Sequence, residues 1–170
     1  MRVDDHTKYD LLGALDAARE HVLDIVDGLD DEALRRPVLP SGWSCLDMIK
    51  HLTYDEEIFW FRAIVAGERE AIDLLQTADA RASWKVADGI AAADVLAGYR
   101  NEIARSNAIV AAIDLDQPPA WWPGDLFGDW RLRDLQQILL HLIVEVSCHA
   151  GHLDATRELI DGRQYLVLTD

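Results

Sequence analysis

The feature that most constrains the fold is a repeat of apolar residues every three or four positions, sustained through four long stretches of the chain. The stretches cover about residues 7–28, 44–67, 91–114 and 132–160. This spacing places apolar side chains on one face of an α-helix, and no segment shows the alternation of a half-buried strand. We therefore expect an all-α protein, a four-helix bundle with long connecting loops, whose topology is left open by the length of those loops.

The boundaries of these helices are marked by capping and helix-breaking residues. Ser44, followed three residues later by Asp47, resembles a capping box and predicts the start of the second helix. Residues 68–87 are mixed in character and predict a short helix and a loop around Trp84. Prolines and tryptophans between 117 and 130 predict a long aromatic loop, and residues 164–168 an extended tail. At 170 residues the chain is expected to form one domain, 1–170.

The charge of the chain argues against several classes of partner. Asp and Glu number 31 against 16 Lys and Arg, a formal net charge of −15. Such a charge repels phosphate groups, so we expect neither nucleic acid nor an anionic membrane surface as a partner. No stretch approaches the roughly 20 apolar residues of a membrane helix. Cys45 and Cys148 form no CxxC pattern and the N-terminus no signal peptide, which favours a reduced, cytoplasmic location, with Cys148 expected to be buried.

The fourth helix carries four ionisable residues that share one side: His141, Glu145, His149 and His152. At about 100° per residue, and with His141 at zero, Glu145 falls near 40° and His149 near 80°. The apolar side of the same helix centres near about 120°, so Glu145 and His149 are expected to point inward and the other two histidines to flank the core. A buried carboxylate is costly unless it is paired or bound to metal, and residues four apart can share one ion.

A third ligand would come from a facing helix, as metal sites in bundle cores require. His51, which borders the buried face of the second helix, is the best candidate. Two histidines and one carboxylate leave positions open for water or substrate, a pattern typical of catalytic sites. A packing role for His51 stays open. His141 and His152 are either partly exposed or contact the metal ligands without binding the ion themselves. Asp55 is either a hydrogen-bond acceptor for His51 or solvated.

Two motifs resemble those of the DinB-like superfamily. Gly42–Leu52, which reads GWSCLDMIKHL, with the acidic run Asp55–Glu57 after it, is similar to the second-helix motif of that superfamily. His141–Asp154, which reads HLIVEVSCHAGHLD, is similar to its last-helix motif, and Arg157–Gly162 continues the match. The resemblance covers essentially the whole chain and implies a four-helix bundle of the DinB-like type.

The resemblance also implies a site and a chemistry. It implies a divalent metal, zinc or nickel, held by His51, Glu145 and His149. A glutamate at the second of these positions resembles the branch of the N-terminal domain of mycothiol-dependent maleylpyruvate isomerase. The expected function is a metal-dependent transferase that uses a thiol, mycothiol or bacillithiol, on an electrophilic small molecule. A homodimer is also implied.

Other functions remain open at this stage. A metal-bound water would make the protein a small hydrolase, and a non-enzymatic stress-response protein would bind a metal or small ligand without turnover. His152 and His141 are weaker candidates for orienting a ligand or moving a proton. Trp43 is a weak candidate for contact with the thiol, and it and the Trp121–Trp122 loop are expected to line a pocket or pack in the core.

Overall fold

The computed structural model describes residues 3–77, 84–124 and 126–165, and all regular elements in these ranges are helical. The long helices are α1 (Val3–Val26), α3 (Cys45–His51) continued by η1 (Leu52–Val65), α5 (Ala92–Ala112) and α6 (Leu135–Asp161). Two short helices, α2 (Asp31–Arg35) and α4 (Arg69–Thr77), lie between them. The all-α bundle expected from the sequence is confirmed. Among the described residues no helix is long and apolar enough to cross a membrane.

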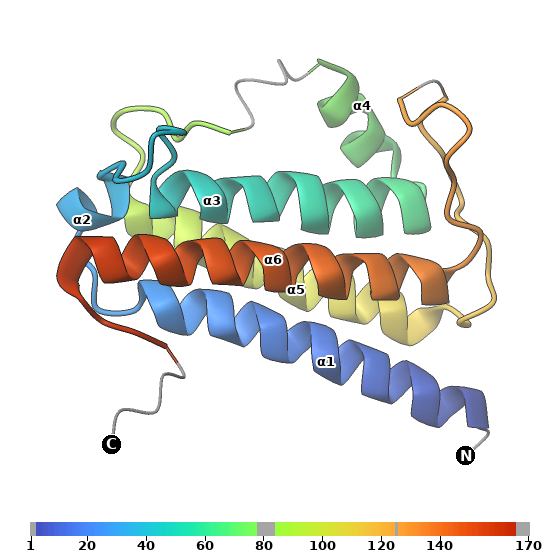
Figure 1. The fold of residues 1–170 in the computed structure, drawn as a ribbon. Coiled ribbons are helices and arrows are strands. Elements are labelled where there is room, and N and C mark those ends of the chain that lie inside the picture. The colour runs from blue at the N-terminus through green and yellow to red at the C-terminus, as the bar shows by residue number, and fades with distance from the viewer. Residues whose placement is uncertain (1–2, 78–83, 125, 166–170) are drawn as a thin grey trace.

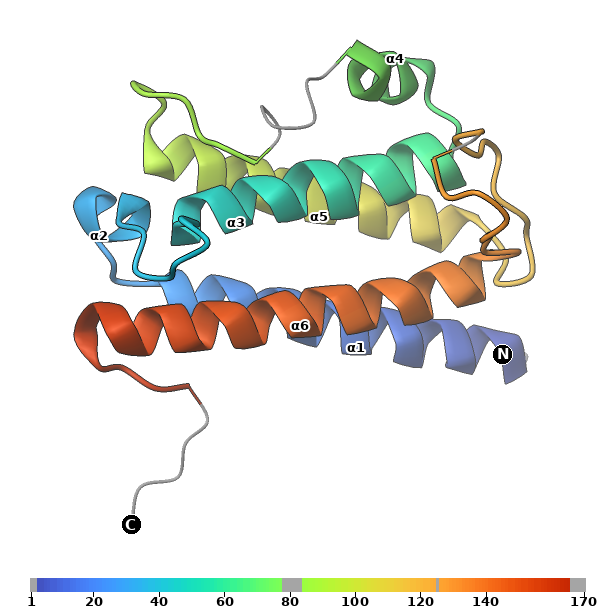
Figure 2. The same cartoon turned by 45° about the horizontal axis from the view of Figure 1, so that its top comes forward.

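The four long helices form two layers, α1 beside α6 and α3–η1 beside α5 (Figures 1 and 2). Within each layer the two helices run in the same direction, and the layers run opposite to each other (Figure 1). The end of η1 and the start of α5 therefore lie at opposite ends of the bundle. The bundle is not a simple up-down-up-down arrangement, which explains the long connection between its second and third long helices.

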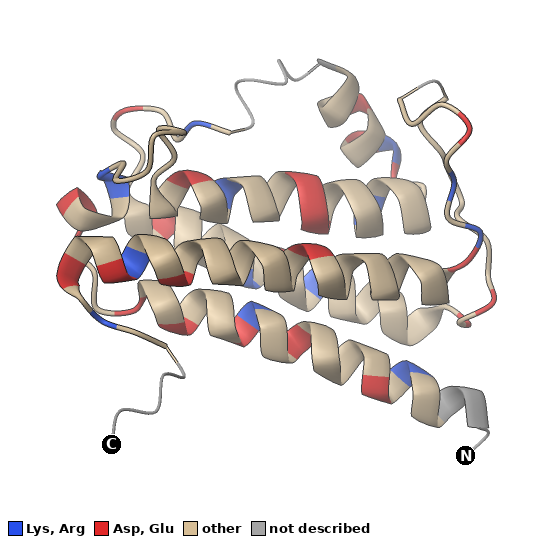
Figure 3. Ribbon diagram, viewed as in Figure 1, with Lys and Arg blue, Asp and Glu red and all other residues tan. Residues whose placement is uncertain are grey.

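The core between the layers is built from the periodic apolar residues of the sequence. It includes fully buried side chains of α1, α3, η1 and α6: Leu15, Val22, Leu46, Ile49, Ile64, Ile138, Leu139 and Leu142. Each contributes about 1.5–3 kcal/mol relative to full exposure. Acidic side chains are spread over the bundle and outnumber basic ones (Figure 3).

The second long helix begins as predicted and then changes its winding. Ser44 accepts a hydrogen bond from the backbone of Asp47, and the Asp47 side chain accepts one from the Ser44 backbone, a complete capping box. From Leu52 to Val65 the helix is a π-helix, with bonds of the i→i−5 type such as Ala66 N to Phe61 O. π-winding over 14 residues is rare, and it sets which side chains share a face.

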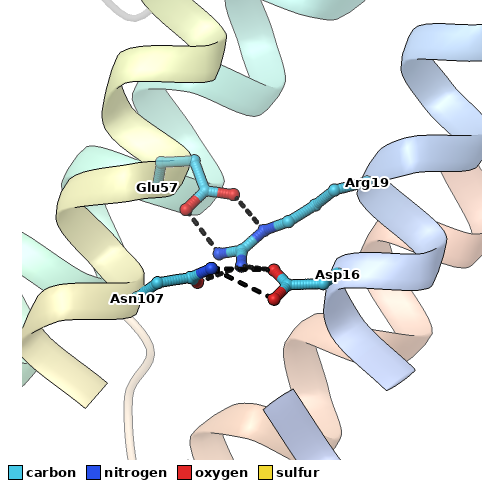
Figure 4. Close-up of polar contacts among 4 residues, drawn as sticks. All are labelled: Asp16, Arg19, Glu57 and Asn107. Carbon is cyan, nitrogen blue, oxygen red and sulfur yellow. Dashed lines mark hydrogen bonds and ion pairs between the residues drawn. The ribbon is translucent and has the colours of Figure 1, made fainter. Parts of the chain in front are cut away.

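A buried ion-pair cluster ties the two layers together. The Arg19 guanidinium on α1 donates two hydrogen bonds to the Glu57 carboxylate on η1, at 2.6 and 2.8 Å (Figure 4). It also donates to Asp16 and to Asn107 of α5, and Asn107 donates to Asp16. Every charge in the cluster thus has a partner, as buried charges require.

The connections agree with the sequence in outline. The loop predicted at 117–130 lies in the connection between α5 and α6, and its side chains Trp122 and Phe127 pack on Phe59 and Trp60 of η1. The mixed segment 68–87 holds α4, and Trp84 follows in a loop. The expected extended tail lies partly outside the described residues. Its described end, Tyr165, stacks on His21 of α1 with ring centroids 4.0 Å apart.

Candidate metal centre

Two histidines from facing helices meet between α3 and α6. His51 is the last residue of α3, and His149 lies in the middle of α6. Their Nε2 atoms are 3.3 Å apart. Two nitrogens bound tetrahedrally to one ion at about 2.0–2.1 Å would lie about 3.4 Å apart, so this pair already has the separation that a shared cation needs. The structure brings together the two histidines that the sequence singled out.

Asp55 fixes the orientation of the His51 ring. Its Oδ2 lies 2.7 Å from His51 Nδ1, one helical turn away. A carboxylate in this position holds the proton on Nδ1 and turns the lone pair of Nε2 toward His149. Of the two roles that the sequence left open for Asp55, the structure supports that of hydrogen-bond acceptor.

Glu56 completes a group of three ligand-type side chains. One donor atom each from His51, Glu56 and His149 lie within 4.8 Å of one another. Glu56 Oε1 is 4.0 Å from His51 Nε2, and the residue is only 6 % exposed. Burial, together with the negative charges of Glu145, Asp55 and Glu57, raises the pKa of Glu56 to about 8.

Sequence reasoning did not single out Glu56, and helix winding explains why. In an α-helix a residue five positions after His51 is rotated by about 140° from it, on another face. A helix closed by i→i+5 bonds returns that residue close to the same face. The π-winding that starts at Leu52 thereby turns Glu56 toward His51. The acidic run Asp55–Glu57 was visible in the sequence, but the winding that selects its middle residue was not.

Glu145, the carboxylate predicted from the sequence, lies on α6 one turn before His149 and is half-buried. It is not a member of the group of three found among the described residues. Its charge is nevertheless close enough to raise the pKa of Glu56. Glu145 thus lies within electrostatic range of Glu56, and its role as a ligand stays a prediction.

The weaker candidates lie at three different places. Trp43 covers the site: its ring centroid is 5.6 Å from that of His51 and 6.3 Å from that of His149. His152 is exposed, with its ring 5.8 Å from His149. His141 lies two turns before His149 among Trp60 and Trp130, and burial lowers its pKa.

The two cysteines are both free, and neither belongs to the group of three. Cys45 is buried, and burial raises the pKa of its thiol to about 11. Cys148 was expected to be buried and is instead exposed. The α6 wheel explains the difference, because position 148 falls about 140° from the centre of the apolar face.

The residues present fit a divalent cation. Glu56 Oε2 and His149 Nδ1 are buried and have no hydrogen-bond partner in the protein. An unpaired buried carboxylate oxygen costs free energy that a cation would offset. Burial together with the neighbouring rings of His51 and His152 lowers the pKa of His149 to about 4, so its ring is neutral and able to donate a lone pair. Imidazole nitrogens with carboxylate oxygens are the ligands of catalytic zinc and similar ions.

Comparison with known proteins identifies a family for the chain. A scan against protein-family models matches residues 10–162 to the family described as mycothiol-S-transferase. Searches of curated proteins and of solved structures gave no match. The family match includes every helix that contributes to the site and most of the chain. The chain therefore belongs to the mycothiol S-transferase family, a member of the DinB-like superfamily.

Proposed function

We propose that this protein is a metal-dependent transferase that joins the sulfur of mycothiol to an electrophilic small molecule. The observation that carries the proposal is the His51–His149 pair with the unpaired oxygen of Glu56 beside it, in a chain of the mycothiol S-transferase family. His51 and His149 would hold the cation, with Glu56 and Glu145 as its carboxylates.

The chain's own residues prepare this site for a cation and a thiol. Asp55 holds the proton of His51 on Nδ1, so that Nε2 presents a lone pair. Trp43 lies edge-on to the His51 ring and nearly parallel to the His149 ring, and so adds an apolar surface beside both. A bound divalent cation would supply Lewis acidity, which lowers the pKa of a coordinating thiol and so favours the nucleophilic thiolate.

The nucleophile is proposed to come from outside the chain. Cys45 cannot supply a thiolate near neutral pH, since burial raises the pKa of its thiol to about 11. Cys148 lies on the exposed side of α6 and is not among the residues that line the pocket beside His149. These two facts support an exogenous thiol, for which the family favours mycothiol over bacillithiol.

Three finer points complete the proposal. Zinc or nickel is the proposed metal, since a mixed imidazole and carboxylate ligand set suits both. A cytoplasmic location is proposed because both cysteines are free. A homodimer is proposed from the resemblance to the superfamily alone.

A single set of measurements tests the function. Protein purified without a metal-affinity tag should contain about one divalent metal ion per chain by elemental analysis. It should conjugate mycothiol to a model electrophile such as 4-nitrobenzyl chloride. Chelation should abolish turnover and the metal should restore it, and His149→Ala should remain folded but inactive. Turnover that persists in metal-free protein would contradict the proposal, as would ester hydrolysis without any thiol.

A further inference from the structure

A pocket opens directly beside His149 on the side away from Glu145. It has a volume of about 290 Å³, just below the range of about 300–1,000 Å³ for small-molecule sites. His149 and His152 are part of its lining, so a molecule in it lies next to the candidate metal centre. The lining surface is mostly apolar and includes four apolar side chains: Leu39, Trp43, Met48 and Leu153.

Two of the three hydroxyl groups in the wall already take part in hydrogen bonds, and the third belongs to the exposed residue Ser41. Ser44 accepts the backbone N–H of Asp47 as the cap of α3. The Thr156 hydroxyl donates to the backbone carbonyl of His152. No Lys, Arg, Asp or Glu is among the residues that line the pocket in the described part of the chain. A charged ligand would therefore lose hydration here without gaining an oppositely charged partner, and a ligand with many hydroxyls would find too few polar groups to replace its bound water.

We propose that this pocket binds the electrophile, and that its substrate class is a small, uncharged, apolar or aromatic molecule. The inference rests on the transferase function proposed above. Mycothiol is a polyhydroxylated pseudodisaccharide, so its sugar groups do not suit a wall of Leu39, Met48 and Leu153. The thiol therefore reaches the metal centre from outside this pocket, and the two substrates occupy separate subsites.

The reaction with such a substrate balances without a further reagent. With 4-nitrobenzyl chloride, the thiolate sulfur forms a bond to the benzylic carbon while the carbon–chlorine bond breaks. Chloride leaves with the bonding electrons, and the thiol proton passes to solvent. The aromatic ring would lie in the pocket beside Trp43, which places its benzylic carbon toward His149.

The test compares two electrophiles of similar size and the same leaving group. 4-Nitrobenzyl chloride is uncharged, and 4-(chloromethyl)benzoate is an anion. We expect the metal-loaded protein to favour the neutral compound by at least about tenfold in kcat/KM, after each value is divided by the uncatalysed rate with mycothiol. Leu39→Lys should reduce this preference severalfold and leave the KM for mycothiol unchanged. Leu29→Lys is the matched control, since Leu29 is another half-buried loop leucine outside the pocket.

A binding measurement separates this proposal from the proposed function. The unreactive analogue 4-nitrotoluene should quench tryptophan fluorescence of the wild type and of Leu29→Lys, and bind Leu39→Lys at least about tenfold more weakly. It should compete with the electrophile and not with mycothiol. Binding without any turnover would support the pocket and remove the transferase function. Equal use of both electrophiles, no binding of 4-nitrotoluene, or competition with mycothiol would overturn the pocket proposal.

Discussion

Glu56 and Glu57 are neighbours in the chain and equally hidden from water, yet their surroundings are opposite. Glu57, 1 % exposed, meets the Arg19 guanidinium through two hydrogen bonds (Figure 4). Glu56, 6 % exposed, faces two histidines and further acidic charge, and one of its oxygens has no partner in the protein. The π-helix η1 carries both, and it turns one toward α1 and the other toward α6.

The contrast shows how a buried charged residue that stabilises the fold differs from one that is available to bind a ligand. A buried charge that is fully paired is complete within the fold, and removing its partner costs stability. A buried charge that lacks a partner costs free energy in the metal-free protein and has value only when something binds. The Arg19–Glu57 pair should therefore govern folding, and Glu56 should govern metal binding.

The largest expected effect is on the paired side. Arg19→Met would leave Glu57 buried without its partner, and we expect a loss of about 3–5 kcal/mol in the free energy of unfolding. Urea unfolding of the metal-free protein measures this loss. Arg100→Met, at an exposed arginine on α5, is the control and should change stability by less than about 0.5 kcal/mol. A double variant, Arg19→Met with Glu57→Leu, should recover much of the loss, and an equally unstable double variant would contradict this account.

For Glu56, which lacks a partner, replacing the carboxylate should raise the free energy of unfolding of the metal-free protein instead of lowering it. Burial raises the pKa of Glu56 from 4.5 to about 8, so the folded metal-free protein holds this proton more tightly than the unfolded chain. Its contribution to stability is present below about pH 4.5 and is lost as the pH rises to about 8. Glu56→Gln should therefore raise the free energy of unfolding of the metal-free protein, relative to the wild type, by more at pH 8 than at pH 5.5. The difference between the two pH values should be on the order of a few kcal/mol. Glu20→Gln, at an exposed site on α1, should show no such difference, and a Glu56→Gln variant with the wild-type pH profile would contradict the assignment.

The sequence predicted the long helices and His149, but neither side of the contrast between Glu56 and Glu57. Helical periodicity and the capping box at Ser44 and Asp47 gave the long helices, and the α6 wheel gave an inward-facing His149. The wheel assumes 3.6 residues per turn, so it could not foresee the π-winding that turns Glu56 to the site and Glu57 to Arg19. The Arg19–Glu57 pair was equally hidden, since its two residues are 38 positions apart and meet only when the layers pack.

The two carboxylates proposed as metal ligands offer a finer comparison. Glu145 was expected from the sequence and Glu56 from the geometry, and we expect both to contribute to cation affinity. Glu56→Gln and Glu145→Gln should each weaken zinc binding by about 100-fold in isothermal titration calorimetry, because each removes a negative charge from a poorly hydrated site. Glu158→Gln, at an exposed position near the end of α6, is the control. An affinity unchanged in either site variant would exclude that residue as a ligand.

The smallest effect concerns a residue that does not touch the cation. Asp55 contacts His51 Nδ1 at 2.7 Å and holds the ring so that Nε2 faces His149. Asp55→Asn keeps the shape of the side chain but replaces the carboxylate with a weaker acceptor, and we expect zinc affinity to fall by about tenfold, the lower end for residues that orient a metal ligand. Because the ligands themselves stay in place, the metal stoichiometry should remain near one per chain when zinc is saturating. A loss of zinc affinity as large as that of Glu56→Gln would mean that Asp55 binds the ion itself. Two neighbouring acidic residues of η1, Asp55 and Glu56, would then be metal ligands, and Glu57 alone would serve the fold.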